Sequence, residues 1–219
     1  MNSARQTTVA RISQERVSAI IRTQDQRLAA DAMNAAIDGG FRVVEFTLTI
    51  PGAIELVREF SKRDELVVGA GTVMTRDAAR QAVSAGAKFL VSPIFDPEVV
   101  SEAASLGVAC IPGAYTPTEM ETAHRAGADF VKVFPAPPGG IEFIEAIRAP
   151  LPHLRLFPTA GVSLENVLDF LNAGCAGVGF VKNLFHPQDM ATRNFDAIRS
   201  RAAAIVQRVS AWTRNPRPA

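Results

Sequence analysis

The stretch AHRAGADFVKVF, residues 123–134, contains the features that decide the fold. An alanine-rich amphipathic segment ends at Gly127, and a short β-prone run follows it. Glycine is favoured where a helix ends in the left-handed conformation, and an apolar run rich in Val, Ile and Phe is typical of a strand buried on both faces. The stretch therefore predicts a helix C-terminus that is followed directly by a buried strand.

The same pattern recurs along the chain, in AIDGGFRVVEF (36–46), AVSAGAKFLVS (82–92), AASLGVACIP (103–112) and FLNAGCAGVGFV (170–181). Gly86, Gly107 and Gly127 lie 21 and 20 residues apart. Gly40 to Gly86 and Gly127 to Gly174 are 46 and 47 residues, so each of these intervals holds two units. The pattern predicts eight strands, each preceding a helical stretch, at residues 17–22, 42–48, 66–70, 88–92, 108–112, 129–134, 154–158 and 176–181.

Helix-capping residues support this division. In TPTE, Thr116 is predicted as N-cap, Pro117 as the first helical residue and Glu119 as the third, which together form a capping box. Asp96 and Pro97 are expected in the same roles, and Ser163 is expected to cap a helix at 164–172. An additional helix is predicted over residues 1–15, and residues 213–219 are expected to be frayed.

Eight consecutive βα units favour a closed (β/α)8 barrel, an α/β fold, formed by residues 1–219 as a single domain. A leucine-rich solenoid has a similar period, but its repeat pattern is absent. A doubly wound open sheet is the main competitor, and its G-x-G-x-x-G is missing after the first strand.

The composition limits the class of protein. Of 219 residues, 47% are hydrophobic and 21% charged, and the formal net charge is +1, which gives no reason to expect a nucleic-acid or membrane partner. Cys110 and Cys175 belong to no CxxC pair, which favours a reducing compartment over a disulfide framework. With no segment near the roughly 18 apolar residues of a membrane span, we expect a cytoplasmic protein. The histidine and carboxylate spacings fit no metal site, so no metal is expected.

Side-chain alternation places two ionisable groups inside the barrel. In the second strand, Glu45 and Thr47 share a face with Val43, and the opposite face is wholly apolar. In the sixth strand, Lys132 lies opposite Val131 and Val133, which suit the helix layer. Arg22, Thr72 and Ser92 fall at the carboxyl ends of their strands, where barrel active sites are built.

A lone lysine in an apolar run needs an explanation, because a buried ammonium is costly unless it is paired or loses its proton. A desolvated lysine near other cations can act as a nucleophilic amine and form a Schiff base with a ketone or aldehyde. A nearby carboxylate, Glu45, would then transfer protons. The alternative is a purely structural Glu–Lys pair, or a lysine whose ammonium reaches solvent.

Six segments extend this interpretation: VVEFTL, GAGTV, VSP, IPGAYTPTE, VKVFPA and FPTAGVSLEN. In order and spacing, from about residue 17 to about 185, they resemble the 2-keto-3-deoxy-6-phosphogluconate (KDPG) aldolase family, which includes 4-hydroxy-2-oxoglutarate aldolases. The resemblance implies a class I aldolase without metal or cofactor, usually a homotrimer. It implies cleavage of a 2-keto-3-deoxy sugar acid, expected to be 6-phosphorylated, to pyruvate and glyceraldehyde 3-phosphate.

The resemblance also assigns roles to residues. Lys132 corresponds to the Schiff-base lysine, Glu45 to the proton-transfer residue, and Thr72, Pro93 and Phe134 to the pyruvate end of the pocket. Together with Arg22, Thr47 and Ser92, the substrate-binding set is expected to include the phosphate-end residues Thr159, Ala160, Gly161, Val181 and Lys182.

The chain departs from the family pattern at three places. Thr49 stands where gluconate-type members often carry an arginine, so that Arg22, which matches galactonate-like relatives, is expected to hold the carboxylate. Ala160-Gly161 replaces Gly-Gly, and Val181-Lys182 replaces Gly-Ser. Lys182 is therefore left with three open roles: binding phosphate, recognising a carboxylate, or neither. Two alternatives to the main hypothesis also remain, an aldolase acting on unphosphorylated 4-hydroxy-2-oxo acids and a barrel that binds a sugar acid or phosphate without cleaving it.

Overall fold

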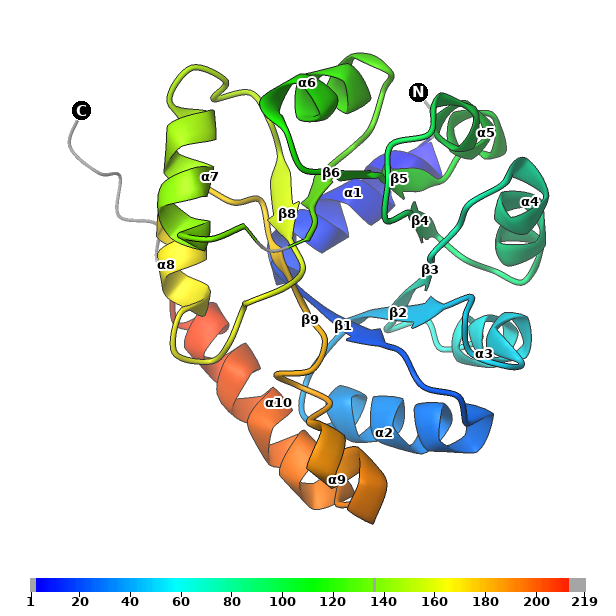
Figure 1. Cartoon of the computed structure of the whole chain (residues 1–219). Helices are drawn as coiled ribbons and strands as arrows, with labels where there is room; N and C mark the ends of the chain where they lie inside the picture. Colours follow the sequence, from blue (N-terminus) through cyan, green and yellow to red (C-terminus); the bar gives the residue numbers. More distant parts are fainter. Residues whose placement is uncertain (1–2, 136, 213–219) are drawn as a thin grey trace.

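In the computed structural model, which describes residues 3–135 and 137–212, parallel strands alternate with helices around a ring (Figure 1). Residues 213–219, for which fraying was predicted, lie outside the described part. The strands are β1 (Val17–Ile21), β2 (Val43–Thr47), β3 (Val67–Gly71), β4 (Phe89–Val91), β5 (Ala109–Ile111), β6 (Gly113–Ala114), β7 (Val131–Val133), β8 (Leu156–Pro158) and β9 (Val178–Phe180).

The helices lie outside the strands, except for α1, which crosses the centre of the ring behind them (Figure 1). They are α1 (Ser3–Glu15), α2 (Gln26–Asp38), α3 (Ala53–Phe60), α4 (Arg76–Ser84), α5 (Pro97–Leu106), α6 (Pro117–Arg125), α7 (Gly140–Arg148), α8 (Val167–Asn172), α9 (Pro187–Thr192) and α10 (Phe195–Ser210). The predicted N-terminal helix is therefore confirmed over the residues described.

Hydrogen bonds join two sheet segments into a closed barrel. One segment has the order β5-β4-β3-β2-β1-β9, the other the order β6-β7-β8, and every paired strand runs parallel. At one junction the Lys132 amide donates to the Pro112 carbonyl oxygen over 2.9 Å, and at the other the Ala176 amide donates to the Leu156 carbonyl oxygen over 2.9 Å. The (β/α)8 prediction is confirmed.

Two local predictions need correction. The fifth strand, predicted over 108–112, ends at Ile111, because Pro112 has no amide hydrogen to donate to a sheet ladder, and β6 follows as a short strand that was not predicted. The helix predicted to start after Ser163 begins at Val167 instead, with Asn166 as its N-cap. The capping box of Thr116 and Glu119 and the cap at Asp96 are confirmed.

The five repeat glycines are confirmed as helix-ending residues in the left-handed region. Gly40, Gly86, Gly107, Gly127 and Gly174 all have positive φ, between 72° and 106°. A residue with a Cβ would be strained there, so these glycines allow each helix to stop and the chain to enter the next strand.

Side-chain alternation divides the buried residues into two cores. Val44, Phe46, Val131 and Val133 belong to the larger core between the strands and the outer helices. An inner core fills the barrel with alternating residues of the same strands, and Ile12 of α1 belongs to it. This inner core consists of Ile12, Val43, Val67, Phe89, Val91, Ala109, Ile111, Phe130 and Phe157. The predicted strand faces are thus confirmed, and α1 closes the amino end of the barrel.

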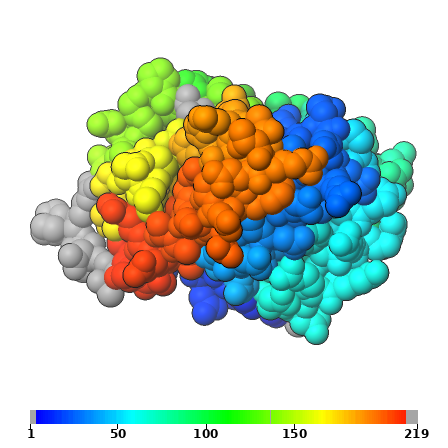
Figure 2. Space-filling view, turned by 90° about the horizontal axis from the view of Figure 1, so that it is seen from below, coloured from blue at the N-terminus to red at the C-terminus, as the bar shows by residue number. Residues whose placement is uncertain are grey.

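The last helices complete the outer layer. Figure 2 shows α9 and α10, coloured orange to red, lying between α8 (yellow) and α2 (blue). Helix α10 buries Ile198, Ala202, Ile205 and Val209, and it packs against α2. Within residues 3–135 and 137–212, none of the helices combines the length and the apolar character needed to cross a membrane.

Candidate active site

Lys132 and Glu45 lie inside the barrel on β7 and β2. The Lys132 residue is 8% exposed and Glu45 is 2% exposed. Each occupies an inward position directly above an inner-core residue of its own strand, since Phe130 and Val43 precede them by two. Arg22 follows the carboxyl end of β1 and Thr72 that of β3. The burial of Lys132 and Glu45 is consistent with the sequence prediction that they face the barrel interior, whereas Arg22 is exposed and Thr72 is half-buried at the mouth.

Burial shifts the pKa values of the two groups in opposite directions. Desolvation raises the pKa of the Glu45 carboxyl, and the charges of Lys132 and Arg22 offset part of that rise. Desolvation lowers the pKa of the Lys132 amine, the Arg22 charge lowers it further, and the Glu45 charge acts against both. Both shifts favour the neutral forms, an amine that can attack a carbonyl and a carboxylic acid that can give up a proton.

Glycine in β3 makes room for the Glu45 side chain. Gly71 pairs with Thr47 in the β2–β3 ladder, and a Cβ at position 71 would overlap Glu45 Oε1. Two residues earlier, a Cβ at Gly69 would overlap the ring of Phe89. At positions 69 and 71, β3 thus has no inward side chain, and the space is filled by the Phe89 ring of β4 and the Glu45 carboxyl of β2.

The mouth of the barrel is lined by Arg22, Thr72 and Phe134. Arg22 Nη2 donates a hydrogen bond of 3.1 Å to Thr72 Oγ1. The backbone of Thr72 has φ 59°, a left-handed conformation that is uncommon for a residue with a branched Cβ. Lys132 Nζ lies 4.8 Å from the centroid of the Phe134 ring, within the range of a cation–π contact.

Other predicted site residues have hydroxyls engaged by the local fold. Thr47 Oγ1 lies 2.9 Å from Thr49 Oγ1, and Ser92 Oγ donates to the Ile94 carbonyl oxygen over 2.7 Å. Pro93 and Phe134 line an apolar hollow of about 440 Å³ at the loops after β4, β6 and β7. Phe134 therefore lines this hollow and also lies next to the Lys132 amine.

The predicted phosphate-end residues lie in the loops that follow β8 and β9. Gly161 is exposed and has φ 73°, which favours glycine at this turn, and Lys182 is exposed. Val181 is half-buried, and its carbonyl oxygen accepts hydrogen bonds from the Leu184 and Phe185 amides. Thr159 is 5% exposed and lines a small interior cavity together with Glu45.

Two asparagines that the sequence analysis did not single out hold these loops. Asn166 Nδ2 donates to the Gly161 carbonyl oxygen over 2.8 Å, and its Oδ1 accepts from the Ser163 amide over 2.8 Å. Asn183 Nδ2 donates to the Val162 carbonyl oxygen over 2.6 Å and so joins the two loops. Asn166 belongs to the segment FPTAGVSLEN, and Asn183 directly follows Lys182. A side-chain amide within each predicted loop is the signal that could have identified them.

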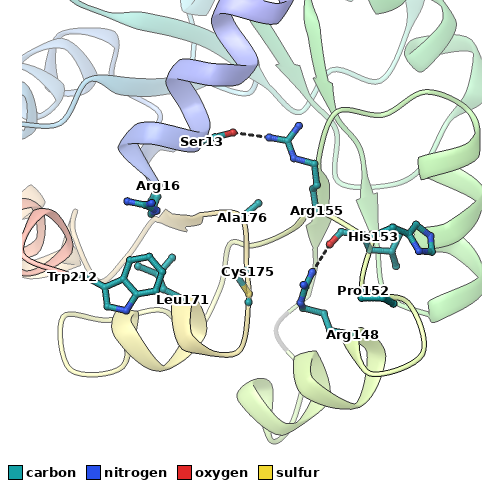
Figure 3. Close-up of a pocket in the computed structure, with 12 residues that line it drawn as sticks. Ser13, Arg16, Arg148, Pro152, His153, Arg155, Leu171, Cys175, Ala176 and Trp212 are labelled. Carbon is teal, nitrogen blue, oxygen red and sulfur yellow. Dashed lines mark hydrogen bonds between the residues drawn. The ribbon is translucent and has the colours of Figure 1, made fainter. Parts of the chain in front are cut away.

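A second hollow, of about 360 Å³, lies at the opposite, amino end of β8, β9 and β1 (Figure 3). Three arginines line it, and each already has a contact within the fold. Arg155 Nη2 donates to Ser13 Oγ of α1 over 2.6 Å, Arg148 Nη1 donates to the Leu154 carbonyl oxygen over 2.7 Å, and the Arg16 guanidinium lies 4.9 Å from the Trp212 ring. These contacts attach α1 and Trp212 to the barrel, away from Lys132.

No group of three or more His, Cys, Asp or Glu side chains suitable for a metal ion is found among residues 3–135 and 137–212. The reactive groups placed at the mouth by the preceding observations are an amine, a carboxyl, a guanidinium and hydroxyls. This set suits imine chemistry on a carbonyl compound that carries an anionic group.

Comparison with known proteins identifies related chains. The family model of KDPG and KHG aldolases matches residues 9–200. The 2-dehydro-3-deoxy-6-phosphogalactonate aldolase of Escherichia coli is 34% identical over 188 residues, covering 84% of this chain and 89% of the relative. The 2-dehydro-3-deoxy-phosphogluconate aldolase of Treponema pallidum is 36% identical over 158 residues, covering 71% and 75%.

A solved structure shows the same fold with a bound reactant. It is KDPG aldolase from Legionella pneumophila with pyruvate captured at low pH as a covalent carbinolamine intermediate. It superimposes with a TM-score of 0.81 at 27% identity, covering 90% of this chain and 97% of that one. By the family match and by these relatives, the chain belongs to the KDPG and KHG aldolase family.

Proposed function

We propose that this protein is a class I aldolase that cleaves a 6-phosphorylated 2-keto-3-deoxy sugar acid to pyruvate and glyceraldehyde 3-phosphate through a Schiff base on Lys132. The observation that carries the proposal is the buried pair of Lys132 and Glu45, whose pKa values are shifted toward the neutral amine and the neutral acid. Family membership supports the reaction class, and the names of the relatives support the substrate class.

In the proposed reaction, the neutral Lys132 amine attacks the C2 ketone of the substrate to form a carbinolamine. Glu45, as the acid, protonates the departing hydroxyl, and water leaves as the iminium forms. Glu45, now a carboxylate, takes the proton of the C4 hydroxyl while the C3–C4 bond breaks. The electron pair of that bond moves into the iminium to give an enamine, and the aldehyde leaves.

The remaining steps return the enzyme to its starting state. Glu45 gives the proton that it took from the C4 hydroxyl to C3 of the enamine, which yields the iminium of pyruvate. Water adds to this iminium, Glu45 takes up the proton that is released, and pyruvate leaves with the Lys132 amine free. Glu45 is suited to both directions of proton transfer because burial raises its pKa above that of an exposed carboxyl, while the charges of Lys132 and Arg22 act against that rise.

Binding of the substrate's two charged ends is assigned to different loops of the mouth. We assign the carboxylate to Arg22, which Thr72 orients through the 3.1 Å hydrogen bond. The pyruvate end would contact Thr72, Pro93 and Phe134. We assign the phosphate to the loops after β8 and β9, where Gly161 allows close approach to the backbone and Lys182 adds a charge.

We also propose that the enzyme works without a metal or organic cofactor, since the iminium itself acts as the electron sink that a metal would supply in another class of aldolase. Assembly as a homotrimer is part of the proposal. Met74, Ile94, Tyr115 and Phe134 are large apolar residues that are exposed in this chain, in the loops after β3, β4, β6 and β7. Light scattering on the purified protein tests the trimer, and a monomer at micromolar concentration would contradict it.

The decisive experiment is reductive trapping. The sequence contains four lysines, at positions 62, 88, 132 and 182, so peptide mass spectrometry can assign the modified one. With pyruvate and borohydride, we expect a reduced pyruvyl group on the peptide that contains Lys132, its loss in Lys132→Met, and its retention in the matched control Lys88→Met. An unmodified Lys132 peptide would contradict the aldolase and favour a barrel that binds a sugar acid without cleaving it.

The substrate class is tested separately by a panel that pairs phosphorylated and unphosphorylated 2-keto-3-deoxy acids, including 4-hydroxy-2-oxoglutarate. We expect the highest kcat/KM with a 6-phosphorylated acid. Equal values for the phosphorylated and unphosphorylated members of each pair would contradict the assignment of the phosphate to the loops after β8 and β9.

A further inference from the structure

Two buried hydroxyls lack a hydrogen-bond partner. Within the described residues, Ser18 Oγ and Thr159 Oγ1 are the buried side-chain oxygen or nitrogen atoms for which the structure provides none. Ser18 is 3% exposed and Thr159 is 5% exposed. Because nearly all buried polar groups in native proteins are paired with protein or with ordered water, each of these hydroxyls calls for a partner.

Both hydroxyl-bearing residues line the same interior cavity, together with Glu45. Apolar residues make up the rest of its wall, namely Ile12, Ile20, Val43, Phe89, Val91, Ile111 and Phe157. The cavity measures about 10 Å³, which is close to the smallest space that holds one water molecule. A buried water molecule needs two to four polar partners, and the cavity is lined by three polar residues, Ser18, Thr159 and Glu45.

The strand register explains why these groups meet. Ser18 of β1 is paired with Val43 of β2 and with Gly179 of β9, so it lies one inward layer below Glu45. Thr159 directly follows β8, and a Cβ at Gly179 would lie 2.8 Å from its methyl carbon. The absence of a side chain at Gly179 therefore lets Thr159 lie against β9, on the side of the barrel that carries Ser18.

We propose that one water molecule occupies this cavity, bonded to Ser18 Oγ, Thr159 Oγ1 and the Glu45 carboxyl, and that Ser18 and Thr159 are positioning residues that orient this carboxyl through it. The role given to Glu45 rests on the proposed function. Water is suited to this position because it donates a hydrogen bond to a carboxylate and accepts one from a carboxylic acid. The same molecule thus holds Glu45 before and after each proton transfer.

The charged groups that interact with Glu45 are Lys132 of β7 and Arg22 of β1. The other residues lining the cavity are uncharged at any pH. Loss of the water would remove a hydrogen-bond donor to the carboxylate, so the pKa of Glu45 would rise further.

A structure determination at high resolution tests the site without reference to activity. We expect density for one water within hydrogen-bonding distance of Ser18 Oγ and Thr159 Oγ1 in the wild-type protein, and none in Ser18→Ala. A cavity without that density in the wild-type protein would overturn the proposal, even if borohydride trapping succeeds. The two proposals can therefore fail independently.

Kinetics test the positioning role. In Ser18→Ala and in Thr159→Val we expect trapping by pyruvate to persist, and kcat to fall about tenfold, well short of the 10²–10⁴-fold typical of a lost acid–base group. In both variants, the limb of the pH–kcat profile that is set by Glu45 should move to higher pH. Thr159→Ser keeps the hydroxyl, so its limb should coincide with that of the wild-type protein. The double variant should be no slower than the slower single variant, because both changes remove the same water.

Two results would overturn the positioning role. One is a pH profile that stays in place in both single variants, and the other is a double variant whose loss is the product of the two single losses. Ser105→Ala is the matched control, because Ser105 Oγ donates to the Glu102 carbonyl oxygen on α5, far in the fold from the barrel interior. Its pH profile should coincide with that of the wild-type protein.

Discussion

Arg22 Nη2 donates a 3.1 Å hydrogen bond to Thr72 Oγ1, and this bond joins the carboxyl ends of β1 and β3 across the end of β2. Glu45 lies on β2 beneath it. The guanidinium is thereby held where its charge lowers the pKa of both Glu45 and Lys132. A single cation thus favours the neutral form of the amine and the charged form of the acid.

Replacement of Arg22 tests this electrostatic role. In Arg22→Gln we expect the pKa of Lys132 to rise, because a neighbouring positive charge has been removed. The rate of imine trapping at saturating pyruvate should then fall most at acidic pH, and its acidic limb should shift to higher pH. Arg27→Gln, on the exposed face of α2, is the control. A limb that does not move in Arg22→Gln would contradict the prediction.

Removal of the Glu45 charge should change the pH dependence of stability. Burial raises the pKa of Glu45 in the folded state, so the folded protein binds the proton more tightly than the unfolded chain, and stability falls as pH rises above about 4.5. Glu45→Gln lacks this loss. We expect its free energy of unfolding, relative to wild type, to increase by about 1 kcal/mol or more between pH 4.5 and pH 8. Urea titrations at both pH values measure the difference, and exposed Glu59→Gln should show none.

The hydrogen atom at Gly71 leaves the space that Glu45 occupies. In Gly71→Ala the new methyl group would overlap Glu45 Oε1, so the carboxyl must move. We expect kcat to fall about 100-fold, as displacements near 1 Å can produce, while trapping by pyruvate continues. Gly140→Ala on α7 is the control, because its Cβ would come no closer than 3.3 Å to the Phe170 ring. Unchanged kcat in Gly71→Ala would remove Glu45 from the proton-transfer role.

The proposal assigns Lys182 to the phosphate of the substrate, so its replacement should weaken binding of the phosphorylated acid and not of the unphosphorylated one. In Lys182→Gln we expect KM for a 6-phosphorylated acid to rise about two- to fivefold, the range typical of an exposed ion pair, with little change for the unphosphorylated analogue. Exposed Lys62→Gln is the matched control. Equal effects on both substrates, or none on either, would show that Lys182 takes no part in phosphate binding.

Much of the fold was predictable because it repeats. The glycine that ends each helix and the two-residue alternation in each strand are local properties, so Gly127 and the faces of Val131 and Lys132 could be assigned without long-range information. The same alternation placed Glu45 inside the barrel. The chemistry of the mouth followed from residues whose burial is unusual for their type.

The remaining features depend on contacts between distant segments. The break at Pro112 could have been foreseen from the missing amide hydrogen, but the join between Lys132 and the Pro112 carbonyl oxygen could not. The late start of α8 depends on Asn166, whose amide bonds the preceding loop instead of leaving Ser163 to cap the helix. Nothing in the sequence distinguishes Ser18 from other serines in strands, because only the closed barrel places it near Thr159.

Helix α1 leaves the barrel open at one end only. Ile12 occupies the amino end of the inner core and lines the cavity that Glu45 also lines, so α1 obstructs the path from this cavity to the amino end of the barrel. Water in this cavity is therefore expected to exchange with bulk solvent through the mouth between turnovers. It should stay in the cavity for as long as a covalent intermediate on Lys132 covers the mouth.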